Sequence, residues 1–158
     1  MILDVHWAEI CQCLPIIEEM SEDATFPAAE LAAFVASKCF YHLQEYNEAL
    51  RLALCAGAHL DVSTKSEYIG TILAKCIDEY KRLRTDKDAL SRIASDEGLA
   101  LAIDPRMETI IEQMFQRCYR DKCFEQAIGI ALDTHRIDKV SRAKKRRQLS
   151  LTDRYIVL

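Results

Sequence analysis

The chain has 158 residues, of which 50% are hydrophobic and 29% charged, so it can form one domain with a core and is too polar for a membrane protein. Its formal net charge is −4, and no apolar run approaches the ~20 residues that a membrane-spanning helix needs. The first residues, Met1-Ile-Leu-Asp4, carry no basic segment and no apolar signal-peptide core. We therefore expect a cytoplasmic and nuclear protein with no membrane partner.

Helical spacing of apolar residues begins near the N-terminus and covers about residues 4–20. Pro15 removes a backbone donor, so this segment should be split or kinked there. A second helix is predicted over 27–43, with Pro27 in its first turn and Glu30 close behind.

A third helix is predicted over 46–56, and Gly57 follows it where a left-handed cap is expected. Ala49 and Ala53 recur at a spacing of four, so the second and third helices should form an antiparallel hairpin with small residues at their contact.

The remaining predicted helices cover 66–84, 105–119 and 122–133. Cations at the end of 66–84 suit a helix C-terminus, and Asp104-Pro105 is a strong helix start. Residues 85–104 have scattered apolar residues and are interpreted as a partly helical, mobile connection. Residues 135–140 are typical of the first turn of a further helix.

The helix over 122–133 repeats the earlier hairpin pattern. Phe124-Glu-Gln-Ala127-Ile-Gly-Ile-Ala131-Leu132 matches Tyr46-Asn-Glu-Ala49-Leu-Arg-Leu-Ala53-Leu54 position by position. An aromatic residue followed by two alanines four apart is typical of tetratricopeptide-like hairpins. No segment alternates with period two, so the fold class predicted is all-α, with stacked antiparallel helix hairpins in an α-solenoid or tetratricopeptide-like rod.

The charge is unevenly distributed along the chain. Of the 21 basic and 25 acidic residues, six basic and one acidic lie in 142–158, which leaves 15 and 24 upstream, a net of −9. An acidic body disfavours nucleic acid as a partner, because phosphate contacts need Lys and Arg. We expect residues 1–140 to be the helical domain and 141–158 a basic, disordered tail. The run Lys144-Lys-Arg-Arg147 is also compatible with nuclear import or an anionic surface.

No catalytic, cofactor-binding or metal-binding residue is predicted. The four histidines lack evident partners, and Ser37 and Cys39 lie inside a helix rather than on the exposed turn that a nucleophile needs. Cys11-Gln-Cys13 is too tight for the usual zinc pair. Four other cysteines lie among apolar residues and are interpreted as small core residues: Cys39, Cys55, Cys76 and Cys118. We expect no enzyme, no cofactor and no small-molecule substrate.

Four blocks in order carry a resemblance to a known family: Phe34-Val-Ala-Ser-Lys-Cys-Phe-Tyr-His-Leu43, Ser66-Glu-Tyr68 with Ala74-Lys-Cys-Ile-Asp78, Met114-Phe-Gln-Arg-Cys118, and Gln126-Ala-Ile-Gly-Ile-Ala-Leu132. They resemble the N-terminal region of the 26S proteasome non-ATPase regulatory subunit 1 family, the largest scaffold subunit of the regulatory particle base. The resemblance covers residues 7–140 and implies an α-helical rod. It also implies a non-catalytic scaffold that contacts other regulatory-particle subunits and supports ubiquitin-dependent degradation.

The family's ring of helical repeats and its C-terminal ubiquitin-receptor segment are absent from the sequence, and the resemblance is expected to end near Ser141. A fragment, a truncated isoform and a gene-model error would each explain this. An alternative function is a free-standing helical-repeat adaptor that binds a peptide or partner helix. A small helical enzyme is a weaker alternative.

Overall fold

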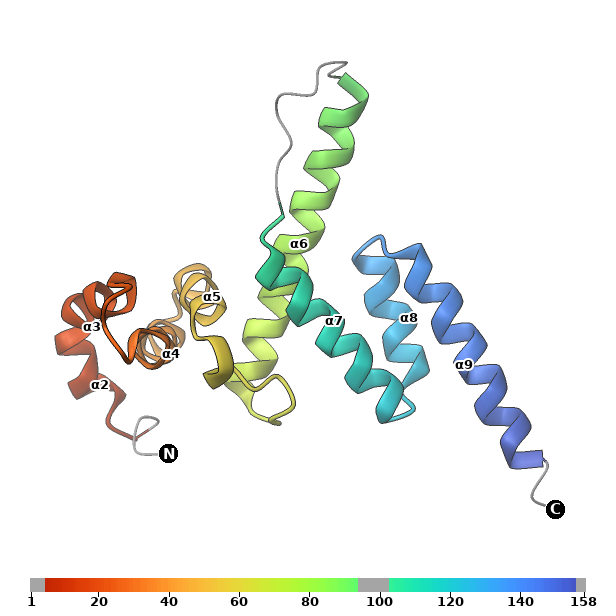
Figure 1. Ribbon diagram of the computed structural model, residues 1–158, viewed down its shortest axis with the longest axis horizontal. Coiled ribbons are helices and arrows are strands. Elements are labelled where there is room, and N and C mark those ends of the chain that lie inside the picture. Colours follow the sequence, from red (N-terminus) through yellow and green to blue (C-terminus); the bar gives the residue numbers. More distant parts are fainter. Residues whose placement is uncertain (1–4, 94–102, 156–158) are drawn as a thin grey trace. The chain divides into compact units, whose positions relative to one another are not determined.

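The computed structural model describes residues 5–93 and 103–155, and every regular element in these residues is a helix (Figure 1). This confirms the all-α fold class. The chain divides into two compact units, Met1–Cys76 and Ile77–Leu158, and the division falls within one long helix, α6 (Glu67–Ile93).

Unit 1 begins with three short elements: α2 (Trp7–Ile10), the 3-10 helix η1 (Cys11–Cys13) and α3 (Leu14–Glu22). Pro15 lies in the first turn of α3, where its missing N–H has no helical partner to lose. The predicted division of the N-terminal helix at Pro15 is therefore confirmed.

A helix hairpin forms the centre of unit 1, and it consists of α4 (Ala29–His42) and α5 (Tyr46–Cys55). α4 packs against both α3 and α5. Ala33, Ala36, Ala49 and Ala53 are at most 1% exposed, so small residues do line the helix contact. The predicted hairpin and the buried positions of its alanines are thus confirmed. The short 3-10 helix η2 (Gly57–His59) then leads toward α6, whose first part buries Tyr68, Ile72 and Cys76.

Gly57 has φ +52°, which confirms the expected left-handed residue after α5. A methyl group added here would also meet the carboxylate of Glu30. We expect Gly57→Ala to lower the free energy of unfolding by about 1–2 kcal/mol, because L-residues are strained at this φ. Gly70→Ala is the matched control. Gly70 is helical with open space around it, so alanine should stabilise by about 0.5–1 kcal/mol in chemical denaturation. Equal effects of both substitutions would contradict the left-handed assignment.

α6 is longer than the predicted helix over 66–84, so the predicted end at Arg84 is wrong. The side chain of Arg82 pairs with Glu79 at 2.5 Å and with Asp86 at 3.2 Å, at helical spacings of three and four residues. The cations that were predicted to lie at a helix C-terminus therefore lie inside a helix, where Arg82 links successive turns. The connection predicted over 85–104 is helical to Ile93, and residues 94–102 lie outside the described residues.

Unit 2 contains the end of α6 together with α7 (Pro105–Arg120), α8 (Phe124–Asp133) and α9 (Ile137–Tyr155). Asp104 caps α7 by accepting a hydrogen bond from the Arg106 N–H at 2.8 Å, as the Asp-Pro signal predicted. In Figure 1, α8 and α9 run side by side, and α8 packs against both α7 and α9. The unit 2 core includes fully buried residues from all three helices: Ile111, Phe115, Ala127, Ala131 and Ala143.

Three connections share one geometry. Each links two helices through three residues, and the middle one, Gln44, Lys122 or His135, has φ between +53° and +64°. In each, the next residue donates a backbone hydrogen bond to the carbonyl five positions back, from Glu45, Cys123 and Arg136 at 2.8–2.9 Å. This is the Schellman pattern of helix C-termini. The turns after α4, α7 and α8 are therefore copies of one turn, which extends the two-hairpin repeat recognised in the sequence.

α9 passes through residue 140 without interruption and stays helical to Tyr155. This differs from the disordered tail expected over 141–158. The physical reason is that Ala143 is fully buried and the Arg146 guanidinium lies 4.9 Å from the centre of the Tyr119 ring. Arg147 also pairs with Glu125 of α8 at 3.3 Å. These contacts oppose the mutual repulsion of the cations. A domain boundary at residue 140 remains a prediction.

Limited trypsin digestion can test the order of α9. A protease needs an unfolded segment, so a docked helix should be cut slowly. We expect cleavage after Lys65, which is exposed in the loop before α6, to precede cleavage after Lys144 and Lys145. Mass spectrometry of early time points measures that order. Rapid loss of the basic run with Lys65 intact would support the disorder that the sequence suggested.

Candidate interaction surfaces

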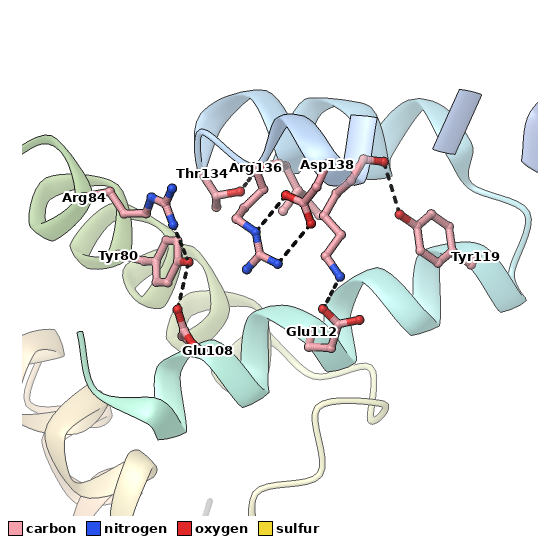
Figure 2. Close-up of polar contacts among 10 residues, drawn as sticks. Tyr80, Arg84, Glu108, Glu112, Tyr119, Thr134, Arg136 and Asp138 are labelled. Atoms are coloured by element: carbon pink, nitrogen blue, oxygen red, sulfur yellow. Dashed lines mark hydrogen bonds and ion pairs between the residues drawn. The ribbon is translucent and has the colours of Figure 1, made fainter. Parts of the chain in front are cut away.

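A polar network joins the helices of unit 2, and Figure 2 shows most of its members. Lys139 at the start of α9 contacts Glu112 of α7, with Nζ 2.5 Å from Oε2. Tyr119 of α7 donates a hydrogen bond to the backbone carbonyl of Lys139 at 3.4 Å. Tyr80 of α6 lies 3.5 Å from a carboxylate oxygen of Glu108. The network therefore connects α6, α7 and α9 within this unit.

Burial gives the Lys139–Glu112 pair its importance. Lys139 is 5% exposed, and its ammonium also lies 5.6 Å from the centre of the Phe115 ring. Partial burial alone would raise the pKa of Glu112, but hydrogen bonds from Lys139 and Gln116 and the nearby positive charges outweigh it and hold that pKa below its usual value. These charges are used within the fold, so the pair acts as a structural link between helices.

Arg136 and Asp138 form a second pair just before and at the beginning of α9. The guanidinium of Arg136 donates to both carboxylate oxygens of Asp138 at 3.1 and 3.2 Å. These hydrogen bonds lower the pKa of Asp138 and raise that of Arg136. An acidic residue in the first turn also suits the helix dipole. The arrangement fixes the point at which α9 begins.

Acid should destabilise unit 2 through these carboxylates. The pKa values of Glu112, Asp138 and Asp104 are all lower in the folded chain than normal. The stability they contribute is therefore present above their ordinary values near 4 and is lost as pH falls through the folded values. We expect the urea concentration at the midpoint of unfolding to decrease as the pH is lowered below 4. In the Glu112→Gln variant this decrease should be smaller. An unchanged slope in the Glu112→Gln variant would contradict the role assigned to Glu112.

Unit 1 contains a buried hydrogen-bonded group at the hairpin. Ser37 of α4 donates a hydrogen bond to the Ala49 carbonyl of α5 at 2.6 Å. Because Ser37 has only one hydroxyl proton, the Tyr68 hydroxyl must be the donor in the 2.7 Å hydrogen bond between Tyr68 and Ser37. Burial raises the pKa of Tyr68 to about 12. Ser37 is fully buried, and its hydroxyl joins three helices rather than facing solvent.

The four histidines occupy local structural positions. His42 stacks on Trp7 with ring centres 5.1 Å apart, and His59 lies 6.4 Å from the Phe34 ring. The Nδ1 atom of His6 lies 3.5 Å from the Oε2 atom of Glu9. His135 is the left-handed residue of the turn before α9. The structure thus assigns each histidine a packing or turn position.

The cysteine positions agree largely with the sequence interpretation. Cys39, Cys76 and Cys118 are buried, whereas Cys55 is half-buried. Among the side chains that the structure describes, those of residues 5–86 and 103–148, no three His, Cys, Asp or Glu groups lie together so as to hold a metal ion. Among the described helices, none has the length and apolar character needed to cross a bilayer.

Exposed apolar side chains mark where contacts with other proteins could form. Ile16 and Met20 share one face of α3, with 60% and 38% exposure. Leu132 and Ile137, 60% and 77% exposed, flank the turn between α8 and α9. An open groove of about 450 Å³ also lies at the start of α8, between Lys122 and Arg147. These features suit protein contacts better than a small enclosed substrate.

Comparison with known proteins gives one consistent result. Residues 1–157 match the family model described as the N-terminal domain of the 26S proteasome subunit RPN2. The chain is similar to the 26S proteasome non-ATPase regulatory subunit 1 homolog A of Arabidopsis thaliana, 43% identical over 90% of this chain and 14% of the relative. It is 44% identical to the Drosophila melanogaster subunit 1, over 87% of this chain and 13% of that relative.

A third relative is the 26S proteasome regulatory subunit RPN2 of Saccharomyces cerevisiae, with 36% identity over 91% of this chain and 15% of the relative. The chain therefore spans about one seventh of the length of these relatives. The expectation that the resemblance ends near Ser141 is wrong, because the family match continues to residue 157.

Proposed function

Because the chain belongs to the family of the 26S proteasome subunit RPN2 N-terminal domain, we propose that it is part of a non-catalytic scaffold subunit of the proteasome regulatory particle. Its proposed partners are other regulatory-particle subunits, and its proposed location is the cytoplasm and nucleus. It would support ubiquitin-dependent protein degradation through protein–protein contacts. The observation that carries the proposal is the identity of 36–44% over about nine tenths of the chain to regulatory subunits.

The way the polar side chains are used supports a scaffold. Charged and hydroxyl groups in both units bond to one another across helices, as Lys139–Glu112 and Ser37–Tyr68 do. Such contacts stiffen a helical hairpin array, in which each repeat is held mainly by its neighbours. Each unit can then present exposed side chains to neighbouring subunits, such as Ile16 in unit 1 and Leu132 in unit 2.

Affinity purification tests this function. The full chain with an epitope tag is expressed in cells and purified under native conditions, and co-purifying proteins are quantified by mass spectrometry. We expect enrichment of regulatory-particle subunits over an unrelated tagged helical-repeat protein of the same size. The variant Gly70→Ala, which keeps the fold, should behave like the original chain. Recovery of a single non-proteasomal partner, without proteasome subunits, would instead support the free-standing adaptor.

A further inference from the structure

Two cysteines from separate elements meet inside unit 1. Cys39 lies in the last turn of α4 and is fully buried in a core cluster with Leu14, Ala36 and Leu52. Cys11 belongs to η1, is half-buried and packs against the same cluster. The two side chains therefore share one small apolar site although 28 positions separate them in the sequence.

The two thiols differ in accessibility, and burial makes the Cys39 thiol a weak acid. Burial, together with a hydrogen bond that the Cys39 thiol makes to the Cys11 side chain, raises the pKa of Cys39 to about 12. Cys39 is thus protonated at neutral pH and shielded from reagents, whereas Cys11 is partly open to solvent. A reagent from solvent should therefore meet Cys11 first, with Cys39 already beside it.

We propose that Cys11 and Cys39 form a peroxide-sensitive thiol pair that converts to a disulfide joining η1 to α4. Cys11 attacks hydrogen peroxide: an S–O bond forms, the O–O bond breaks, and a sulfenic acid and one water result. The Cys39 sulfur then attacks the Cys11 sulfur. The S–S bond forms, the S–O bond breaks, and the leaving hydroxide takes the Cys39 proton as a second water. The two thiols are oxidised by two electrons, and the peroxide is reduced to two waters.

Proximity favours this pair over the other thiols. Cys13 lies two residues from Cys11 and is exposed, but its position within the same short 3-10 helix does not bring it into the Cys39 core cluster. Holding two reacting groups together accelerates their reaction, which compensates for the low acidity of Cys39. The short 3-10 helix can also adjust more readily than α4 to the close sulfur–sulfur approach of a disulfide.

A disulfide here would change the behaviour of unit 1. It would enclose α3 and most of α4 in a covalent loop and so restrict the unfolded chain. The oxidised protein should then melt about 6–10 °C higher than the reduced protein, and a reducing agent should reverse the shift.

The experiment treats the full chain with hydrogen peroxide, blocks remaining thiols with an alkylating agent and maps peptides without reduction. We expect a cross-linked peptide pair containing Cys11 and Cys39 that dithiothreitol removes. Cys11→Ser and Cys39→Ala should each abolish both the cross-link and the rise in melting temperature. The matched control Cys13→Ser should retain both.

Circular dichroism of the reduced variants separates loss of the thiol from loss of the fold. Cys11→Ser changes a half-buried position and is the variant on which the conclusion depends if Cys39→Ala fails to fold. Recovery of a Cys11–Cys13 disulfide would overturn the proposal. So would accumulation of Cys11 sulfenic acid, trapped by dimedone, without any bond to Cys39.

Discussion

Replacing Phe115 with alanine is expected to lower the free energy of unfolding by about 3–5 kcal/mol, the range for large aromatic truncations in a core. Phe115 is fully buried, its ring centre lies 6.3 Å from that of Tyr119, and the ammonium of Lys139 packs over its face. The substitution removes apolar contacts and also leaves the buried lysine without its ring. Urea unfolding monitored by circular dichroism measures the loss.

Leu132→Ala is the control for Phe115→Ala, because Leu132 is also a large apolar residue of unit 2 but is 60% exposed. Its truncation should change stability by less than about 0.5 kcal/mol. A similar decrease in the free energy of unfolding in both variants would mean that the decrease does not come from a cavity at Phe115. The assignment of Phe115 to the core would then be wrong.

Replacing Ala53 with leucine should destabilise by about 1–3 kcal/mol, because the added carbons overpack the contact between α4 and α5. Ala53 is 1% exposed and lies one turn from Ala49, which is fully buried. Ala74→Leu, at an exposed position of α6, is the matched control and should be close to neutral. Thermal melting distinguishes the two variants. An unchanged melting temperature for Ala53→Leu would show that the register of the hairpin differs from the one described.

Local signals in the sequence predicted much of the fold. Asp104 followed by proline correctly predicted the start of α7, and Gly57 correctly predicted the end of α5. Both predictions were possible because helix caps depend on neighbouring residues in the sequence. The alanine spacing gave the hairpin contact for the same reason, since one helix face is read from a few turns of sequence. Pro15 likewise marked the break before α3.

Features that depend on distant residues were not predicted. The end of α6 was predicted too early. A cluster of cations is typical of a helix C-terminus, but it also occurs inside a helix, where Arg82 forms ion pairs with neighbouring turns. The helical structure of α9 depends on contacts with Tyr119 and Glu125, which belong to other helices. The pattern of charges along 141–158 gives no information about these contacts. The contact of Cys11 with the core cluster around Cys39 likewise depends on packing between elements that are distant in the sequence.

The sequence predicted the places of these three turns but not their shared geometry, because their left-handed residues are Gln44, Lys122 and His135 rather than glycine. Left-handed backbone in such residues is unfavourable, and the backbone hydrogen bonds of the turn compensate for it. The direction reversal is therefore fixed by main-chain hydrogen bonds, and the exposed side chain at each turn does not have to be absent, as it is in glycine. These three positions can thus present an amide, an ammonium and an imidazole to solvent at the tips of the hairpins, while the helix-packing faces lie elsewhere.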